Sequence, residues 1–314
     1  MKNYSNIFKP TKKNIGKVAN ILRSGGLAAL PTETVYGLAG NAYKDKAVNK
    51  IYKLKKRPRK NPLIVHFDSL KSIEQETEFN PYLKKLYKKF SPGPISYVLK
   101  LKKNSKISKQ LLTQDRTVAC RVPNNVYFRK IIKLVDTPLA APSANISNHV
   151  SPTSAQDVWE EFRNKILFIL DGKRSKIGVE SSVINLVGKP KLLRPGKISQ
   201  AELKKIIKTI SINKSKKILS PGQLKKHYSP GIPIYLNKQY PKKNGALLVF
   251  GKSNFKGKNI FYLSKKGLLD EAAKNLYSML RNIKNKGFKN ISINKIPNHG
   301  VGIAINDRLQ RASK

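Results

Sequence analysis

Residues 27–67 constrain the fold of this chain more than any other segment, because they read as two buried strands joined by a helix. The apolar run at 27–30 predicts a short strand, and the run at 63–65 predicts the next one. Between them, apolar residues recur at helical spacing over 45–54, with Asp45 as the predicted N-cap. Such a unit predicts an α/β fold, with polar sites where its strands end.

The loop after the first strand is rich in hydroxyl groups. Pro31 ends the strand, and the loop is predicted to be closed by Gly37 and Gly40. It contains four candidate polar residues, Thr32, Glu33, Thr34 and Tyr36. We expect small-ligand chemistry to begin here, although Thr32 and Glu33 also fit plain turn formers and Tyr36 fits a packing residue.

A basic cluster, Lys55, Lys56 and Arg57, crowds the predicted end of the helix. Cations there are also explained by the helix dipole alone. Pro58 is predicted to stop the helix and to fix the direction in which Arg57 leaves it. An arginine held in this way is a good anion clamp, and His66 ends the following strand.

Eight motifs occur in a fixed order along the chain, and together they resemble the threonylcarbamoyl-AMP synthase family, which has a YrdC-like domain. The first four are PTETVYGL at 31–38, K-x-R at 55–57, NPLIVH at 61–66 and TVACRVP at 117–123. The others are APSAN at 141–145, GVESSVINL at 178–186, LLRPG at 192–196 and SPGQLKKHYSP at 220–230. The last motif marks the longer, two-domain members of the family.

The resemblance and the pattern predict two α/β domains. Residues 1–209 are expected to form a YrdC-like domain with a twisted mixed sheet, 210–232 a linker or lid, and 233–314 a smaller Rossmann-like α/β domain. Helices are predicted at 15–24 and from Leu268 onward. Further strands are predicted at 95–101, 118–122, 166–170, 183–187, 191–194, 233–236, 246–250 and 259–263.

The resemblance implies a reaction in which L-threonine, bicarbonate or CO2, and ATP give threonylcarbamoyl-AMP and pyrophosphate. It implies Mg²⁺ carried by the nucleotide, and no metal site of the protein's own. The product would serve threonylcarbamoyladenosine modification of tRNA next to the anticodon, with separate proteins performing the transfer. Negative charge accumulates on the phosphates during such a reaction, so fixed cations and donors matter more than a protein nucleophile.

By position, the resemblance assigns residues to each substrate. It assigns catalysis and ATP contacts to Lys55, Arg57, Ser143 and Asn145, further ATP contacts to Asn61, Thr117, Ser151, Arg194 and Tyr228, and threonine contacts to Thr34, His66, Arg121, Ala141 and Ser181. Simpler explanations stay open for several of them. Arg121 could form a strand-edge ion pair, His66 could bond backbone, and Ser143 and Asn145 could cap a helix.

Tyr228 lies in the linker, and we expect it to reach ATP as part of a lid that excludes water. The chain also departs from the family pattern. His149 and Val150 replace the usual basic residue and proline after the S-x-N element, which leaves the local loop and the role of Ser151 open. Ser182 stands where threonine is usual.

The net charge of +47, from 64 Lys and Arg against 17 Asp and Glu, predicts attraction to polyanions such as double-stranded RNA or tRNA. A proteome-wide lysine bias, with no dedicated RNA site, is the favoured explanation of this charge. The single cysteine, Cys120, fits a buried inert thiol, and four scattered histidines disfavour a zinc site. No phosphate-binding glycine loop is present, nor an apolar run that could span a membrane, and we expect a cytoplasmic protein.

Two alternative functions remain at this stage. One keeps the fold but transfers carbamoyl groups during metallocentre maturation, which is weakened by the absence of acylphosphatase and zinc-finger sequences. The other is an RNA-binding module with a vestigial nucleotide pocket. The presence of all four residues assigned to catalysis argues against it: Lys55, Arg57, Ser143 and Asn145.

Overall fold

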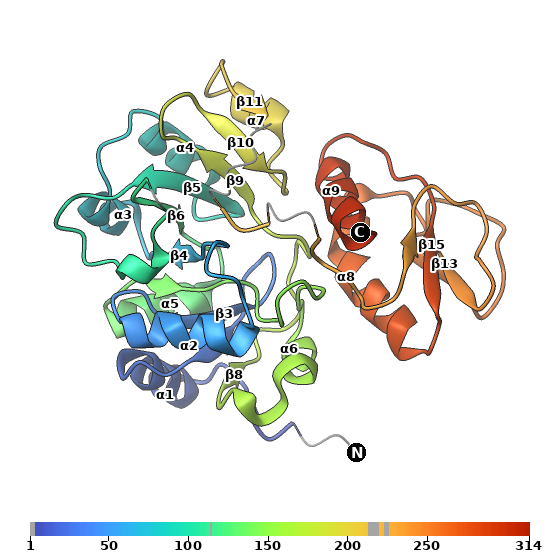
Figure 1. The fold of residues 1–314 in the computed structure, drawn as a ribbon, viewed down its shortest axis with the longest axis horizontal. Coiled ribbons are helices and arrows are strands. Elements are labelled where there is room, and N and C mark those ends of the chain that lie inside the picture. Colours follow the sequence, from blue (N-terminus) through green and yellow to red (C-terminus); the bar gives the residue numbers. More distant parts are fainter. Residues whose placement is uncertain (1–3, 114, 213–219, 223–225) are drawn as a thin grey trace.

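The computed structural model describes residues 4–113, 115–212, 220–222 and 226–314. It contains two α/β domains, joined by a connecting segment that passes between them (Figure 1). The parts of the predicted linker at 213–219 and 223–225 lie outside the described residues. In the described part of the chain, no helix has the length and apolar character needed to cross a bilayer.

The larger domain is built on one mixed sheet of eleven strands in the order β1-β8-β2-β3-β7-β4-β6-β5-β9-β10-β11. Both parallel and antiparallel neighbours occur: β4 runs parallel to β6, for example, and β5 antiparallel to it. The mixed sheet confirms the predicted fold class. The strands are β1 Ile7–Phe8, β2 Ala28–Leu30, β3 Gly37–Asn41, β4 Ile64–His66, β5 Ile95–Lys100, β6 Thr117–Arg121, β7 Leu139–Ala140, β8 Ile169–Leu170, β9 Ser182–Asn185, β10 Lys191–Arg194 and β11 Ser211–Ile212.

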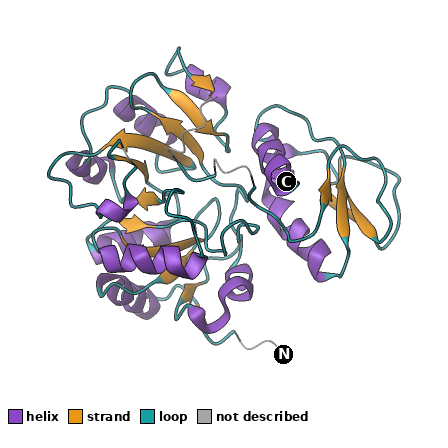
Figure 2. Ribbon diagram, in the orientation of Figure 1, coloured by secondary structure: helices purple, strands orange, loops and turns teal. Residues whose placement is uncertain are grey.

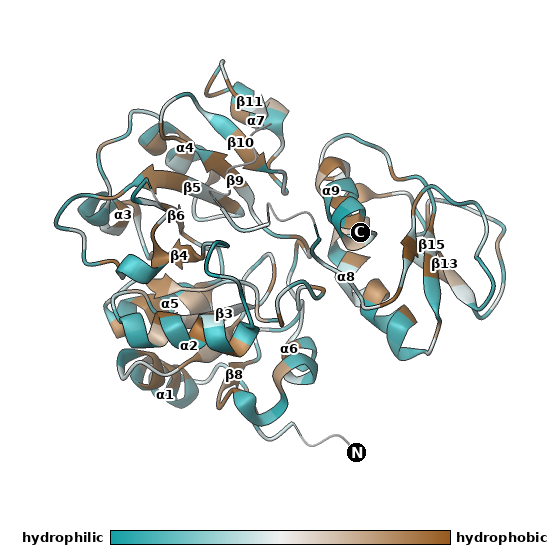
Figure 3. Cartoon of the chain, in the orientation of Figure 1, coloured by the Kyte–Doolittle hydropathy of each residue, from teal (hydrophilic) through white to brown (hydrophobic). Residues whose placement is uncertain are grey.

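Helices cover both faces of this sheet (Figure 2). Ala28 and Leu30 of β2 share a cluster with α1 and α5, whereas Ala29 between them packs toward α2, as the alternation of a strand requires. Apolar residues accordingly concentrate on the strands and on the inner sides of helices (Figure 3). The helices are α1 Lys12–Arg23, α2 Asp45–Lys55, α3 Leu70–Glu76, α4 Leu83–Phe90, α5 Val126–Val135, α6 Ala155–Phe162 and α7 Gln200–Lys204, with short 3-10 turns η1 Lys109–Leu111 and η2 Arg163–Lys165.

The smaller domain has a parallel four-stranded sheet in the order β12-β15-β13-β14. Its strands are β12 Ile234–Tyr235, β13 Gly245–Phe250, β14 Ile260–Ser264 and β15 Asn290–Ile293, and its helices are α8 Leu269–Asn285 and α9 Gly302–Ala312. All-parallel pairing confirms the predicted Rossmann-like character. Both helices lie between this sheet and the larger domain (Figure 1).

The predicted loop after Pro31 extends only to Tyr36, and its predicted closing part at 37–40 is wrong, because Gly37–Asn41 form the strand β3, paired antiparallel with β2. Glycines disfavour strands on their own, but a Cβ on Gly40 would lie 2.9 Å from Leu27 and 3.1 Å from Ile51. Close packing of the strand against α2 therefore decides its conformation. The predicted strand at 166–170 is shorter than expected, since only Ile169–Leu170 pair in the ladder.

The end of α2 also differs from expectation. Lys44 rather than Asp45 is the N-cap, and Lys56 takes a left-handed conformation with φ 49° as the C-cap. The helix thus ends before Arg57, and Pro58 is not the residue that stops it. Arg57 therefore belongs to the loop that follows the helix and not to its last turn.

The two domains share a packed interface. Val35, Val150 and Val179 of the larger domain belong to the same apolar cluster as the core of the smaller one. Gly178 lets α8 approach, because a Cβ there would lie 2.4 Å from the carbonyl oxygen of Ala273. β11 continues the large sheet to Ile212, beyond the boundary at 209, and β12 opens the second sheet at Ile234.

Candidate active site

A pocket lies on the large sheet, on the same face as a small apolar cluster around Val98 and Val183. Ile64 and Ala119 belong to that cluster. His66 and Arg121 follow two residues later on the paired strands β4 and β6, so they point to the same face and into the pocket. The linker closes the opposite side through Pro221, Gly222, His227 and Tyr228.

The structure brings eight of the sequence-predicted residues to the pocket wall: Thr34, Arg57, His66, Arg121, Ala141, Ser143, Arg194 and Tyr228. The other six, Lys55, Asn61, Thr117, Asn145, Ser151 and Ser181, are buried but are not among the lining residues. Five of these six hold a pocket element in place, as described below. Thr117 stands apart, because it begins β6 four residues before Arg121 and pairs its hydroxyl with Thr113 at 2.7 Å.

Arg57 is held from one side of its guanidinium. Its Nε donates to the carbonyl of Asn61 at 2.9 Å, and its Nη2 donates to Asn61 Oδ1 at 2.6 Å and to the carbonyl of Pro62 at 2.9 Å. Among the described residues, no acceptor is recorded for Nη1. Burial lowers the pKa of Arg57 to about 10, so the group stays charged at neutral pH. A rigid cation with free donors suits an anionic ligand.

Lys55 supports the S-x-N element. Its Nζ donates to the carbonyl of Ser143 at 2.5 Å and also to the carbonyl of Asn145. Burial, followed by the charge on Arg57, lowers the pKa of Lys55 well below its usual value. Asn145 in turn donates to the carbonyl of His149 at 2.9 Å. The lysine therefore fixes the backbone that presents Ser143 and does not line the pocket itself.

Arg121 forms the ion pair that the sequence left open as its simpler explanation. Its Nη2 lies 2.7 Å from Glu33 Oε1, and its Nη1 donates to Thr34 Oγ1 at 3.0 Å. Its Nε donates to the carbonyl of Gly93 at 3.2 Å. Three of the five N–H donors of a guanidinium are thus engaged, and the others remain available on the pocket side. Glu33 is therefore more than a turn former, because it positions this arginine.

His66 and Ala141 both line the pocket. The backbone N–H of Ala141 bonds to the carbonyl of Ile64 at 2.9 Å, whereas His66 lies opposite Leu139 in the same antiparallel pair of strands. The Nδ1 atom of His66 is buried and has no hydrogen-bond partner among the described residues. Burial and the charge on Arg121 lower the pKa of His66 well below its usual value, so the imidazole is neutral. A neutral imidazole in the pocket wall keeps one acceptor nitrogen, which suits a ligand group that donates a hydrogen bond.

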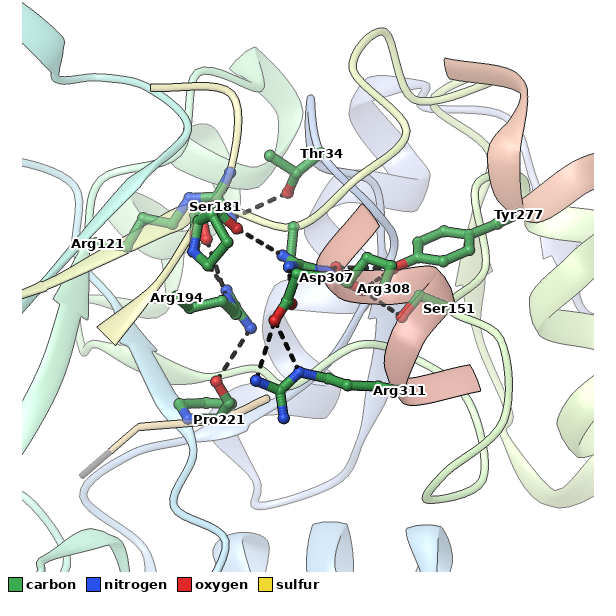
Figure 4. Close-up of polar contacts among 12 residues, drawn as sticks. Thr34, Arg121, Ser151, Ser181, Arg194, Pro221, Tyr277, Asp307, Arg308 and Arg311 are labelled. Carbon is green, nitrogen blue, oxygen red and sulfur yellow. Dashed lines mark hydrogen bonds and ion pairs between the residues drawn. The ribbon is translucent and has the colours of Figure 1, made fainter. Parts of the chain in front are cut away.

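Arg194 links the sheet to the linker (Figure 4). Its Nη2 and Nε donate to the hydroxyl and carbonyl of Ser181 at 3.0 and 3.1 Å, and its Nη1 donates to the carbonyl of Pro221 at 3.3 Å. The Ser181 hydroxyl also lies 2.8 Å from that of Ser96. Ser181 therefore orients Arg194 from beneath the pocket.

Glu180 is the pocket residue that sequence reasoning missed. It is buried, and its carboxylate accepts from Ser151 Oγ at 2.5 Å, from the Tyr277 hydroxyl at 2.9 and 3.0 Å, and from Arg308 Nε at 2.8 Å. Burial raises the pKa of Glu180, but Arg308 and Arg194 outweigh it and hold the value at about 2. Its place inside the 178–186 motif was the available signal, whereas its partners Ser151, Tyr277 and Arg308 lie 29, 97 and 128 residues away.

Tyr228 belongs to the connecting segment and is buried, with φ 63°. Its ring stacks on Tyr277 at 5.8 Å between centroids, and the guanidinium of Arg308 lies 5.2 Å from its centroid. Its hydroxyl comes close to Gly222, where an added Cβ would lie 2.8 Å away. Next to it, burial and Arg57 lower the pKa of His227 to about 3, so this histidine is neutral.

The unusual loop after the S-x-N element is tied to the linker. The backbone N–H of Ser229 donates to the carbonyl of Asn148 at 2.7 Å, and His149 Nδ1 lies 3.0 Å from Glu161 Oε2. Arg281 of α8 binds the other oxygen of Glu161 at 2.9 Å. His149 therefore takes part in a structural network outside the pocket. Cys120 is fully buried in β6, and burial raises the pKa of its thiol, as expected for an inert cysteine.

Comparison with protein families matches both domains. Residues 20–196 match the Sua5, YciO and YrdC family model, described as telomere recombination, and residues 198–314 match the C-terminal domain of threonylcarbamoyl-AMP synthase. With the arginine-lined pocket, these matches define a two-domain enzyme of the nucleotidyltransferase kind. Threonylcarbamoyl-AMP synthases of Pyrococcus abyssi and Bacillus subtilis are 36% and 34% identical, over 94% and 95% of this chain and 92% of each relative. The chain belongs to the threonylcarbamoyl-AMP synthase family, which confirms the resemblance seen in its motifs.

Solved structures agree with this assignment. The crystal structure of P. abyssi Sua5 complexed with L-threonine matches with a TM-score of 0.90 and 34% identity, covering 98% of this chain and 97% of that one. Escherichia coli YciO matches with a TM-score of 0.54 at 19% identity, over 60% of this chain and 93% of that one. The second match shows a shared fold only, whereas the first extends over both domains.

Proposed function

We propose that this protein makes L-threonylcarbamoyladenylate and pyrophosphate from L-threonine, bicarbonate or CO2, and ATP. The observation that carries the proposal is one pocket that combines Arg57, Arg121 and Arg194 with hydroxyl groups and a neutral histidine. The threonine amine first combines with CO2 to give a carbamate. A carbamate oxygen then attacks the α-phosphorus of ATP, and pyrophosphate leaves with the electron pair of the broken P–O bond.

The ATP side of the pocket is proposed to be the part around Arg57 and Arg194. Both guanidiniums are held by protein carbonyls and line the pocket, so they can stabilise the charge that develops on the phosphates. Ser143 offers a hydroxyl beside them, on the backbone that Lys55 fixes. Asn61, Asn145 and Ser151 support this wall, and Thr117 remains a proposed ATP contact that lies outside the lining residues.

The threonine side is proposed to lie between Thr34 and Ala141. The free donors of Arg121 would bind the carboxylate, and the neutral imidazole of His66 would accept from the amine. The hydroxyl of Thr34, already bonded to Arg121 and Thr32, would receive that of the substrate. Ser181 acts indirectly, through Arg194.

Magnesium is proposed to enter with the nucleotide, where it would neutralise phosphate charge. The residues present fit this arrangement. Both oxygens of Glu180, the carboxylate in the pocket wall, are occupied by hydrogen bonds from protein donors. Among the described residues, no group of three or more His, Cys, Asp or Glu side chains is placed to hold an ion.

Threonine-dependent pyrophosphate release tests the proposed function. Wild-type protein is expected to release pyrophosphate from ATP only with L-threonine and bicarbonate, and to give the adenylate by mass detection. Serine serves as the comparison amino acid, and it should react more weakly because it lacks the methyl group. Pyrophosphate release that does not depend on threonine, or no pyrophosphate release from folded protein, would contradict the proposal.

A lid role for Tyr228 predicts a specific defect. In Tyr228→Phe the hydroxyl near Gly222 and Arg194 is lost while the buried ring is kept. A lost neutral hydrogen bond costs about 1 kcal/mol, so we expect ATP affinity to fall roughly fivefold and hydrolysis of the preformed adenylate to accelerate. Calorimetry and adenylate decay measure the two effects. Unchanged ATP affinity and decay, here and in a linker deletion, would refute the lid.

An RNA-binding module is the second candidate, and the charge of +47 favours it. Tight binding of double-stranded RNA at physiological salt, with no joint binding of ATP and threonine, would support this candidate instead. We propose that the enzyme acts in the cytoplasm, and that separate proteins transfer its product to tRNA.

A further inference from the structure

The smaller domain reaches the pocket wall through two side chains, Tyr277 of α8 and Arg308 of α9. Both are buried, and both bind the carboxylate of Glu180, which itself lines the pocket (Figure 4). Arg308 also donates to the carbonyl of Pro195 at 3.0 Å, next to Arg194. The second domain is therefore connected to the site by directed polar contacts as well as by packing.

An unneutralised carboxylate at this position would oppose the proposed chemistry. In the part of the chain that the structure describes, the charged groups that line the pocket are Arg57, Arg121, Arg194 and Glu180. A buried carboxylate without a partner would repel the phosphates, and it would attract the nearest free cation. Arg194 is a neighbouring cation: its Nε donates to the carbonyl of Ser181, the residue that follows Glu180, and both Arg194 and Glu180 line the pocket. Its charge also helps to lower the pKa of Glu180.

Arg308 and Tyr277 also contact the ring of Tyr228. Arg308 lies against its face at 5.2 Å, and Tyr277 stacks on it at 5.8 Å. Arg308 is held in turn by Asp307, at 2.6 Å from its Nη1, and Asp307 pairs with Arg311 at 3.0 Å. One arginine of α9 thus supports the linker residue and neutralises the wall carboxylate.

We propose that Arg308, assisted by Tyr277, is a positioning residue of the reaction: it neutralises Glu180, so that Arg194 stays directed at the nucleotide, and it supports Tyr228 over the pocket. This inference rests on the proposed function and gives the second domain a defined part in it. Arg308 acts through Glu180, Arg194 and Tyr228, and not by touching substrate.

Arg308→Met tests the inference because methionine keeps apolar bulk and removes the charge. We expect the dissociation constant for a non-hydrolysable ATP analogue, measured by calorimetry, to rise by about ten- to a hundredfold. Threonine binding, which uses the other side of the pocket, should change less than threefold. Arg308→Lys keeps a charge near Glu180, and we expect it to recover most of the ATP affinity.

The double variant Glu180→Gln with Arg308→Met separates this role from simple domain docking. Removing the carboxylate makes neutralisation unnecessary, so ATP affinity should return to within about threefold of the Glu180→Gln variant. Arg281→Met is the matched control, because it breaks the interdomain pair with Glu161 outside the pocket. It should lower thermal stability and leave ATP affinity within about twofold of wild type.

A pH series gives an independent readout. In Arg308→Met, burial without its main counter-charge should raise the pKa of Glu180, while Arg194, His227, Tyr228 and Tyr277 still face it. ATP affinity of this variant should therefore improve as the pH falls from about 8 to 5.5. Wild type should show no such improvement, because Arg308 keeps the carboxylate ionised throughout this range.

Wild-type ATP affinity in Arg308→Met, or absence of rescue by Glu180→Gln, would overturn the inference. Equal losses in Arg308→Met and Arg281→Met would do so as well. If Arg308→Met does not fold, the double variant and Arg308→Lys carry the same test. Failure of the proposed function is distinguishable, because wild type would then bind the ATP analogue without releasing pyrophosphate in the presence of threonine.

Discussion

Replacing Arg121 with alanine is expected to weaken L-threonine binding by about ten- to a hundredfold and to destabilise the fold. The guanidinium joins Glu33, Thr34 and the backbone of Gly93, and both charged partners are buried. Each charge-assisted bond contributes about 1.5–3 kcal/mol, which sets the affinity loss. Removing one member of a buried pair leaves the other charge unpaired, which lowers the free energy of unfolding by about 3–5 kcal/mol. Calorimetry with threonine and denaturant titration measure the two effects.

Two further variants separate binding from stability at this position. Arg121→Lys keeps a charge for Glu33 but cannot contact Glu33 and Thr34 together, so it should recover stability more than affinity. Glu33→Gln combined with Arg121→Met removes both charges and should be more stable than Arg121→Ala, yet equally poor at binding threonine. Normal threonine affinity in Arg121→Ala would show that the arginine is only a structural ion-pair partner.

The sequence predicted the fold well where one local signal dominated. The β10 strand was predicted at its observed bounds, Lys191–Arg194, and the helix of residues 45–55 was recognised by its apolar period. The β3 strand was missed because its two glycines read as a loop, whereas packing against α2 makes them necessary. Local propensity is overridden when the close approach of two elements requires a residue without a side chain.

Some residues of the predicted site could likewise be placed from local sequence signals, whereas others could not. His66 and Arg121 end the paired strands β4 and β6, so their common face could be inferred from strand alternation. Arg57 follows the helix α2, and its position could be inferred from the end of that helix. Lys55 could not be resolved, because only the folded loop shows that its Nζ points to carbonyls of Ser143 and Asn145. Arg308 was beyond sequence reasoning, since it lies 128 residues from Glu180 and no spacing rule connects them.

Arg57→Ala is expected to reduce threonine-dependent pyrophosphate release by at least about a hundredfold, mainly through kcat. Arg57 is buried, charged and held by Asn61 and Pro62, so its free donors are preorganised for phosphate charge. Removing one such donor typically lowers kcat by about 10²–10³. Single-turnover measurements at saturating ATP separate this effect from weaker nucleotide binding. Arg57→Lys should recover little, because an ammonium cannot keep the bonds to Asn61 while it faces the ligand.

Asn61→Ala shows whether the orientation of Arg57 matters apart from its charge. Asn61 is not among the pocket-lining residues, but its side-chain oxygen accepts from Arg57 Nη2 at 2.6 Å. Removing that acceptor leaves the cation in place and frees it to move, so we expect a smaller loss, of about tenfold in kcat. If Arg57→Ala and Asn61→Ala lose the same activity, the contribution of Arg57 depends on the orientation of its guanidinium alone. If Arg57→Ala keeps normal turnover with saturating substrates, charge stabilisation at the transferred phosphorus must come from another cation, such as Arg194, and the proposed role of Arg57 would be wrong.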